Sequence, residues 1–383
     1  MLKPVDVSSD AVLKVSLGEF VLQRLPKRPL ELLRAWDAAD EYVLEVCAER
    51  LKPAARVLII NDSFGALAVA LHAFAPTAVS DSYLSQQATR LNLAANGLAL
   101  QTVTLVNSLE PIAGVFDLVF IKTPKTLALL EDQLIRLRPC LGPDCQVIVA
   151  GMVKNMPSAI WTLLERLLGP TTTGLAKKKA RLIYVVPNPD LPPVSSPYPV
   201  SYPLEGTAYT LSNHANVFSR DSLDIGARFF LQHLPHTTGA VEIIDLACGN
   251  GVLGIMAATQ NPNAKLHFVD ESYMAVASAR DNFQRAFGGI ADADFYVGDG
   301  LTDFPAAYAD IILCNPPFHQ HNTVGDHIAL GLFAQAKKAL KPGGELWIVA
   351  NRHLNYATAL KRLFGQYWLV ASNAKFVVLK VKA

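Results

Sequence analysis

The sequence contains few cysteines and no long apolar run. Its five cysteines in 383 residues are an odd number and form no Cys-x-x-Cys pair, so we expect isolated structural thiols rather than disulfides or a zinc site. No apolar run reaches the roughly 18 residues that a membrane helix needs, and no charged segment followed by an apolar one opens the chain. These absences favour a cytoplasmic protein that neither spans a membrane nor holds a structural metal.

Charge is also scarce. Charged residues make up 17% of the chain, the formal net charge is +1, and 51% of the residues are hydrophobic. This composition indicates a compact globular protein without a disordered tail, and it gives no sign of nucleic-acid binding by itself. His319, His321 and His327 lie close together but have no Cys or acidic partners at ligand spacing, which argues against a metal site.

Proline is concentrated near the middle of the chain. Residues 187–203 contain so many prolines that helix and central strand are disfavoured, and we expect a semi-rigid linker there. The length of the chain also suggests two domains. The sequence therefore predicts domains at 1–186 and 204–383.

The second half alternates apolar runs with helical patterns, which is typical of a mostly parallel, doubly wound α/β sheet. We expect strands at 241–246, 265–270, 294–297, 310–314 and 345–350, and a terminal antiparallel hairpin from 368–372 and 375–380. We expect helices at 251–259, from a cap at Ser272 to Phe287, and at 326–340, where residues 341–344 end the last one.

The first half follows the same plan. Gly65 precedes Gly251 by 186 residues and Asp81 precedes Asp270 by 189, so the register between the halves is nearly kept. We interpret this as a duplication that yields two tandem Rossmann-like domains. The positions of Asn315 and Phe318 are taken by Lys122 and Lys125, which would abolish chemistry at the first copy but could hold phosphate.

A glycine-rich turn follows the first strand of the second half. Residues 245–254 have the form Asp-x-x-x-Gly-x-Gly-x-x-Gly, and Asp270 ends the next strand, where an acidic residue can hold ribose hydroxyls. A nicotinamide dehydrogenase could carry the same pattern. Two carboxylates count against it, because Asp245 could attract a cationic ligand and Asp299 could meet an adenine amine. Both could equally be loop carboxylates.

The run Asn315-Pro316-Pro317-Phe318 follows the apolar strand at 310–314. The prolines make this turn stiff, so an amide oxygen, a rigid carbonyl and an aromatic ring are held together at the carboxyl edge of the sheet. Such a group suits a flat base with an exocyclic NH2. The alternative is an ordinary strand-to-loop turn.

The second half resembles the Rossmann-like S-adenosylmethionine-dependent methyltransferases in the order of four features. These are the glycine turn, Asp270, Asp299 and the Asn-Pro-Pro-Phe turn. Residues 213–220, 223–228 and 315–320 are similar to segments of the bacterial ribosomal RNA guanine-N2 methyltransferases, which also carry a degenerate N-terminal copy. Segments 125–131, 168–173 and 178–183 point to the large-subunit (23S) member, with the small-subunit (16S) paralogue as the alternative.

The resemblance implies a cofactor, a substrate and a set of roles. The cofactor is S-adenosyl-L-methionine, and the substrate is 23S ribosomal RNA methylated at a guanine N2 amine. The catalytic residues implied are Asn315, Pro316, Pro317 and Phe318. The cofactor-binding residues implied are Phe218, Asp245, Cys248, Gly249, Gly251, Asp270, Asp299 and Asn315.

RNA contacts are expected mainly from the first half. The candidates are Lys122, Lys125, Lys177, Lys178, Lys179, Arg181 and Arg352. The cluster at 177–181 could equally be a solvated surface segment. Two further functions stay open at this point: methylation of a protein glutamine, whose amide resembles the guanine edge, and ribosome assembly without catalysis.

Overall fold

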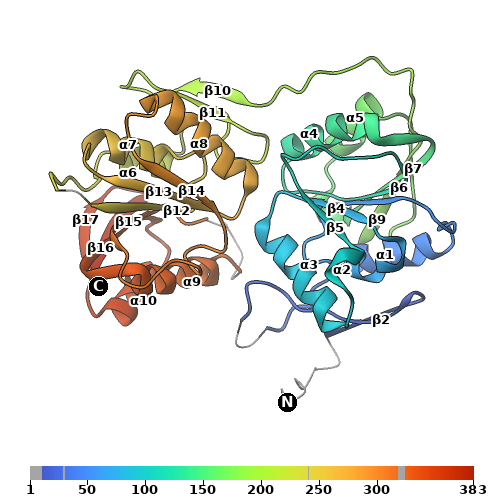
Figure 1. Cartoon of the computed structure of the whole chain (residues 1–383), viewed down its shortest axis with the longest axis horizontal. Coiled ribbons are helices and arrows are strands. Elements are labelled where there is room, and N and C mark those ends of the chain that lie inside the picture. The colour runs from blue at the N-terminus through green and yellow to red at the C-terminus, as the bar shows by residue number, and fades with distance from the viewer. Residues whose placement is uncertain (1–10, 29–30, 240, 318–323) are drawn as a thin grey trace. The chain divides into compact units, whose positions relative to one another are not determined.

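A computed structural model of the chain describes residues 11–28, 31–239, 241–317 and 324–383. The chain divides into two compact units, residues 1–197 and 198–383. Each unit is a seven-stranded sheet with helices on both faces (Figure 1).

The sheet of the second unit is mostly parallel. Its strands are β12 (Glu242–Leu246), β13 (Lys265–Asp270), β14 (Ala293–Val297), β15 (Ala309–Cys314), β16 (Leu340–Asn351), β17 (Trp368–Ser372) and β18 (Phe376–Lys382). They lie in the order β14-β13-β12-β15-β16-β18-β17, and only β18 and β17 introduce antiparallel pairing. The expected terminal hairpin is therefore confirmed, with β18 inserted between β16 and β17.

Among the described residues of this unit, five helices cover the sheet. They are α6 (Ile225–Leu231), α7 (Val252–Gln260), α8 (Tyr273–Phe287), α9 (Val324–Ala339) and α10 (Tyr356–Phe364). One apolar core packs α6, α7 and α8 on one face of the sheet, and a second packs α9 and α10 on the other. Burial of both faces explains why the central strands read as continuous apolar runs rather than as alternating patterns.

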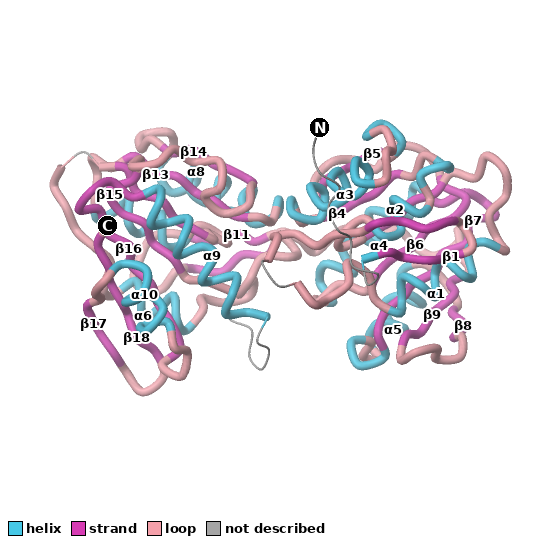
Figure 2. The backbone as a smooth tube through the Cα atoms, turned by 90° about the horizontal axis from the view of Figure 1, so that it is seen from below, coloured by secondary structure: helices cyan, strands magenta, loops and turns pink. Residues whose placement is uncertain are grey.

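The first unit repeats this topology strand for strand. Its sheet has the order β5-β4-β3-β6-β7-β9-β8. The strands are β3 (Val57–Ile60), β4 (Thr77–Ser80), β5 (Thr104–Asn107), β6 (Phe116–Lys122), β7 (Leu141–Met152), β8 (Thr171–Thr173) and β9 (Ala180–Val185). Helices α1 (Ala38–Ala48), α2 (Ala66–Ala70) and α3 (Tyr83–Ala95) share one core, and α4 (Leu127–Leu137) and α5 (Ala159–Leu167) share the other. Figure 2 shows the helices and strands of each unit along the backbone. The prediction of two tandem Rossmann-like domains is confirmed.

A small hairpin precedes each sheet and is tied down in the same way. In the first unit it is β1 (Val12–Val15) with β2 (Gly18–Val21), and in the second β10 (Val200–Pro203) with β11 (Thr210–Asn213). The Asn92 amide bonds both backbone groups of Gln23, just after β2, and the Asn282 amide does the same with Ser212. The duplication therefore extends to single side chains, since Asn92 and Asn282 hold the two hairpins by the same pair of hydrogen bonds.

Local signals predicted several boundaries to the residue. β13 covers 265–270, and α8 begins after an N-cap at Ser272, whose hydroxyl accepts from the Ala275 N–H, and ends at Gly288 with φ 56°. A capping hydroxyl and a C-terminal glycine act within one turn of the chain, so they can be recognised from the sequence.

Two expected elements differ. β10 occupies 200–203 of the expected linker, as the edge of a two-stranded sheet where proline is tolerated. Arg138 donates to the carbonyls of Leu191 and Pro192, each at 2.6 Å, so the start of the linker is attached to the first unit. β16 begins at Leu340 and includes the expected turn at 341–344, because Ala309 pairs with Leu340 across a register shift.

The cysteines fit the expectation of isolated structural thiols. All five cysteines are free and buried. Within the part of the chain that the structure describes, no helix is long and apolar enough to cross a membrane.

Candidate functional site

Four predicted site residues of the second unit lie at the carboxyl edge of its sheet. Strand order reverses between β12 and β15, and ligands of open α/β sheets bind outside the carboxyl ends of the strands at such a switch point. Asp245 lies in β12, Asp270 ends β13, Asp299 follows β14 and Asn315 follows β15. The fold thus brings together residues that are up to 70 positions apart.

The glycine turn adopts left-handed backbone conformations at alternate positions. The φ angles are 59° at Ala247, 55° at Gly249 and 81° at Gly251. A Cβ on Gly251 would meet Ala279 of α8 at 2.9 Å, whereas a Cβ on Gly249 would meet nothing within 4 Å. Gly251 is therefore required by packing, and Gly249 leaves open space at the site.

Gly254 completes the turn pattern inside α7. A Cβ there would lie 2.2 Å from the ring of Phe268, a residue of β13. This glycine permits close approach of helix and strand. The first glycine of the motif, Gly249, differs from the other two because a Cβ added there would meet no described atom within 4 Å.

Asp245 is fully buried. One carboxylate oxygen, Oδ2, accepts from the Gly254 N–H at 2.8 Å, and the other, Oδ1, is buried and has no hydrogen-bond partner in the described part of the chain. Burial, and secondly the charge of Asp270, raise the pKa of Asp245 to about 8. A cationic or hydrogen-donating group placed beside Oδ1 would offset both effects.

Asp270 holds the glycine turn against the second strand. Its carboxylate accepts from the Gly249 N–H and from the Ser272 N–H, each at 3.0 Å. The thiol of Cys248 is buried beside Asp270 and Asp245, and burial raises its pKa, so it stays neutral. The pKa of Asp299 is raised by partial burial and by Asp303.

Asn315 presents a buried acceptor. Its amide Nδ2 donates to Asp224 Oδ2 at 3.5 Å, while its Oδ1 is buried and has no hydrogen-bond partner among the residues that the structure describes. Pro316 is buried and Pro317 is exposed. Phe318, predicted to stack on a base, lies outside the described residues, as does His319. Phe218 is 66% exposed, so its ring does not belong to the core.

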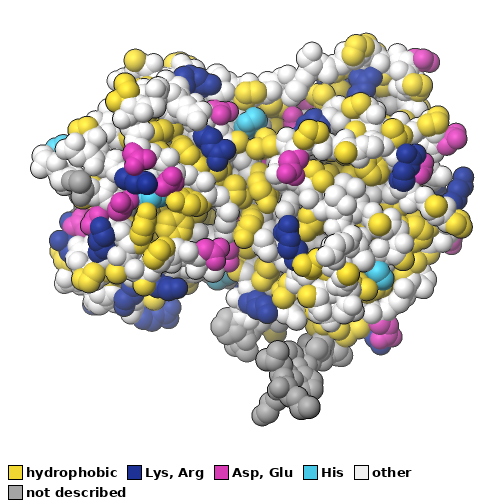
Figure 3. All heavy atoms as spheres, viewed as in Figure 1, with side chains coloured by type: hydrophobic (Ala, Val, Ile, Leu, Met, Phe, Trp, Pro, Cys, Tyr) yellow, Lys and Arg dark blue, Asp and Glu magenta, His cyan; other side chains and the backbone are white. Residues whose placement is uncertain are grey.

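The predicted RNA contacts differ in how accessible they are. Lys125 and Lys179 are exposed, as is Arg352, which donates to the Asn373 carbonyl at 3.1 Å. Lys177 pairs with Glu45, and Lys178 pairs with Glu41 at 2.8 Å. Arg181 is half-buried with its Nε unpartnered. On the face shown in Figure 3, basic and acidic side chains are interspersed rather than gathered by sign.

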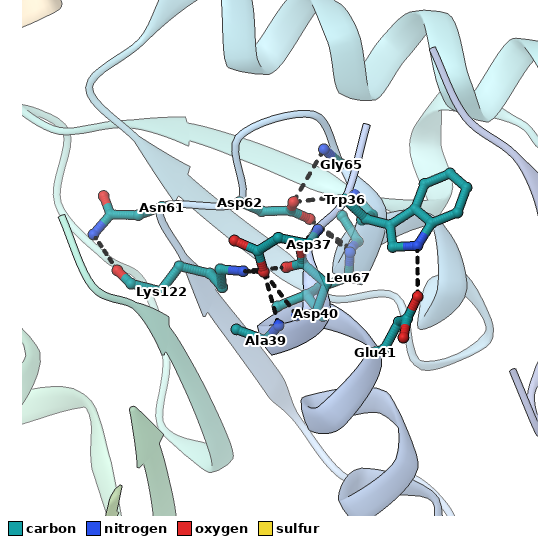
Figure 4. A network of polar contacts seen from close by, with 12 residues as sticks. Trp36, Asp37, Ala39, Asp40, Glu41, Asn61, Asp62, Gly65, Leu67 and Lys122 are labelled. Atoms are coloured by element: carbon teal, nitrogen blue, oxygen red, sulfur yellow. Dashed lines mark hydrogen bonds and ion pairs between the residues drawn. The ribbon is translucent and has the colours of Figure 1, made fainter. Parts of the chain in front are cut away.

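Lys122 is the exception among these residues. It is 9% exposed, and its ammonium lies 2.8 Å from Asp37 Oδ1 and 2.7 Å from Asp40 Oδ1 (Figure 4). A buried ammonium held by two carboxylates is not displayed to a phosphate. This placement does not support the prediction that Lys122 contacts RNA.

Asp62 closes the first unit's counterpart of the glycine turn. Its buried carboxylate accepts from the backbone N–H groups of Gly65, Ala66, Leu67 and Ala68 at 2.9–3.1 Å (Figure 4). The equivalent position in the second unit is Cys248. In the first unit, therefore, the chain's own carboxylates and Lys122 fill the edge of the sheet that is open at Gly249 in the second.

Two site residues escaped the sequence reasoning. Asp224 contacts Asn315, and Asn250 donates to the side chains of Asn213 and Tyr202, tying the glycine turn to the β10–β11 hairpin. Asp224 lies in segment 223–228, which the resemblance singled out without giving it a role. An acidic residue directly before a helical pattern was the available signal.

Comparison with known proteins covers nearly the whole chain. A family model described as the RLMG N-terminal domain matches residues 10–189, and one described as the methyltransferase small domain matches residues 208–380. Proteins named ribosomal RNA large subunit methyltransferase G are 52% identical in Stutzerimonas stutzeri, over 96% of this chain and 98% of that protein, and 47% identical in Streptomyces griseus, over 95% and 97%.

A solved structure shares the two-unit fold. It is the T. thermophilus 16S rRNA N2 G1207 methyltransferase in complex with AdoMet and guanosine, with a TM-score of 0.76, 21% sequence identity and 97% of each chain covered. At this identity the likeness is one of fold.

Proposed function

This chain belongs to the ribosomal RNA large subunit methyltransferase G family, and from that premise we propose that it methylates the exocyclic N2 amine of a specific guanine in 23S ribosomal RNA. S-adenosyl-L-methionine would supply the methyl group: the N2–CH3 bond forms as the S–CH3 bond breaks, and the products are N2-methylguanosine, S-adenosylhomocysteine and one N2 proton, which passes to solvent. The observation that carries the choice of an amine is Asn315 Oδ1, a buried acceptor at the carboxyl edge of the sheet that no described residue contacts by a hydrogen bond.

The residues of the second unit fit this cofactor. Gly249 leaves open space where a ligand can approach the backbone, and Asp245 Oδ1 is a buried acceptor that lacks a partner. An ammonium or sulfonium group would be stabilised beside that carboxylate. We assign the ribose hydroxyls to Asp270, the adenine amine to Asp299, and cover of the cofactor to Phe218; Cys248 and Gly251 shape the turn.

S-adenosylmethionine supplies an electrophilic methyl group when it is bound. The lone pair of guanine N2 is delocalised into the ring, so the amine is a poor nucleophile. Asn315 Oδ1 and the Pro316 carbonyl accept the two N2 hydrogens, which directs the lone pair toward the methyl group. Pro317 stiffens the turn, and Phe318 stacks on the base.

Placement accounts for most of the rate enhancement in this scheme. Well-oriented groups reach effective molarities of about 10⁵–10⁸ M, so two fixed acceptors suffice without a dedicated general base. The guanine must leave its RNA context to reach the edge of the sheet, as happens in other enzymes that modify bases.

Recognition of RNA is assigned mainly to the first unit. Its exposed Lys125 and the cluster Lys177, Lys178, Lys179 and Arg181 are the proposed phosphate contacts, together with Arg352 of the second unit. A ribosomal RNA substrate places the protein in the cytoplasm, which is part of the same proposal.

Two other functions use the same turn. The 16S paralogue would methylate the same atom in another RNA, and a protein glutamine methyltransferase would present an amide NH2 to Asn315. The family membership favours the large-subunit RNA over both.

The test is transfer of a labelled methyl group from S-adenosylmethionine to three acceptors, followed by nucleoside mass spectrometry. The acceptors are 23S rRNA, 16S rRNA and intact subunits from a strain that lacks this gene. N2-methylguanosine only in 23S material is the expected result. Label in 16S material would move the substrate to the small subunit, and label in protein alone would overturn the RNA proposal.

A further inference from the structure

Asp224 makes two contacts through one oxygen. It is the N-cap of α6, where its Oδ2 accepts from the Ala227 N–H at 2.8 Å, and the same Oδ2 lies 3.5 Å from Asn315 Nδ2. The two side chains are 91 positions apart in the chain. Because the cap fixes Asp224 to the first turn of α6, the carboxylate is held in place independently of Asn315.

The contact decides which way the Asn315 amide faces. A carboxylate only accepts hydrogen bonds, so the NH2 end of Asn315 must point to Asp224 and the oxygen must point away. That oxygen is the buried, unpartnered Oδ1. With the amide turned by 180°, an NH2 group would face the substrate's NH2 group, and two donors cannot bond each other.

The space around Asp224 is consistent with this arrangement. A Cβ on Gly226 would lie 3.0 Å from Asp224 Oδ2 and 3.1 Å from the ring of Phe376. A glycine at this position therefore keeps the carboxylate free of a close side-chain neighbour.

The first unit retains the same pairing without the chemistry. Asp37 is the N-cap of α1, and its Oδ1 accepts from Lys122, the residue at the position of Asn315 (Figure 4). In both units a helix-capping aspartate contacts the side chain at the end of the fourth parallel strand. The contact between the capping aspartate and the side chain at the strand end is thus a property of the fold. The identity of that side chain, Lys122 or Asn315, determines the chemistry of the contact.

We propose that Asp224 is a positioning residue, which orients the Asn315 amide so that Oδ1 accepts from the substrate amine. This inference rests on the proposed function. Asp224 acts through Asn315 and contacts neither the methyl group nor the base.

An exchange of the two side chains tests the proposal. In Asn315→Asp, two carboxylates face each other and the donor is lost, so kcat for methylation of 23S rRNA should fall by about 10–100-fold, the scale of a small misplacement. In the double variant Asp224→Asn with Asn315→Asp, the donor and acceptor are exchanged. The amide nitrogen at position 224 can then donate to the carboxylate at 315, and kcat should recover at least tenfold relative to Asn315→Asp. Because one oxygen of Asp224 makes both contacts in the wild-type protein, that nitrogen cannot also accept from the Ala227 N–H, so the cap is lost.

Asp224→Ala supplies the second measurement. It should lower kcat by the same 10–100-fold while the Kd for S-adenosylmethionine, measured by calorimetry, changes less than about twofold. Thr126→Ala is the matched control, because Thr126 caps α4 in the first unit and its hydroxyl accepts from the Leu129 N–H. This control should leave kcat unchanged.

The outcomes separate the two proposals. If the wild-type protein labels no RNA, the proposed function fails. If the wild type labels 23S rRNA but the exchanged pair is no more active than Asn315→Asp, Asp224 only caps α6 and the positioning role is wrong. A loss of cofactor affinity in Asp224→Ala equal to its loss of kcat would also overturn it.

Discussion

At the scale of single residues, Asn315 combines two properties that are rarely found together in an amide. One end is held by a carboxylate, and the other is a buried acceptor without a partner. A buried polar atom left unpaired costs free energy, so its retention needs a reason, and a substrate amine supplies one.

Asn315→Ala should reduce kcat at least about 100-fold, because the amine loses an acceptor and its orientation. Calorimetry should give a Kd for S-adenosylmethionine within about twofold of the wild-type value, since Asp245, Gly249 and Asp270 are untouched. Equal losses in cofactor affinity and turnover would show that Asn315 serves the cofactor rather than the substrate.

Asp245 should make the stability of the second unit depend on pH. Its pKa is raised from 3.8 to about 8, so the folded state keeps a proton that the unfolded state releases. The favourable contribution is full below about pH 4 and is lost as the pH rises toward 8. Without cofactor, the Tm of Asp245→Asn minus the Tm of the wild type should therefore increase from pH 5 to pH 8.

Thermal melts of both proteins across this range measure the effect. Asparagine keeps an oxygen that can accept from the Gly254 N–H, so the packing of α7 is maintained. Parallel pH profiles for wild type and variant would mean that Asp245 is ionised throughout.

At the scale of elements, the glycines of the turn serve two purposes: Gly249 leaves space for a ligand, and Gly254 lets α7 pack closely on Phe268. Gly249→Ala meets no neighbouring atom and costs about 1 kcal/mol from its left-handed backbone, but it fills the space open to a ligand. Gly254→Ala drives a Cβ into the ring of Phe268 and should cost about 1–3 kcal/mol.

Melting temperatures and cofactor affinities of the two variants give a direct comparison. Gly249→Ala should keep most of its stability and lose cofactor affinity, whereas Gly254→Ala should lose mainly stability. Full cofactor affinity in Gly249→Ala would remove this glycine from the proposed binding site.

At the scale of the whole molecule, two copies of one fold carry different side chains at the carboxyl edges of their sheets. At the positions of Cys248 and Asn315 in the second unit the first carries Asp62 and Lys122, and Asp40 supplies a further carboxylate to the Lys122 ammonium (Figure 4). The full chain should therefore bind one S-adenosylmethionine. Calorimetric titration measures this stoichiometry, and two sites per chain would show that the first unit also binds the cofactor.

Removing charge from the first unit should weaken RNA binding. Replacing Lys177, Lys178 and Lys179 with Ser should lower the affinity for 23S rRNA and flatten its dependence on salt concentration, since fewer counterions are released. Replacing the exposed Lys27, Lys52 and Lys154 removes the same charge elsewhere in that unit and is the matched control. Identical salt slopes for both variants would dismiss the cluster as an RNA contact.

The sequence by itself determined the fold class, the duplication and most strand ends, because apolar runs, glycines and capping residues act over a few neighbouring positions. β13 and α8 were predicted to the residue for this reason. The same signals placed Asp245, Gly249, Asp270 and Asn315 at the carboxyl ends of their strands or in the turns that follow them.

Only the tertiary structure decided which side chains meet. Asp224 and Asn315 are 91 positions apart, and Lys122 lies 85 from Asp37 and 82 from Asp40. Local pattern does not encode such pairings, because they depend on how helices pack beside the sheet. For that reason Lys122 looked like a phosphate ligand in the sequence but is a buried ion-pair partner in the fold, and Asp224 gained a role only from its contact with Asn315.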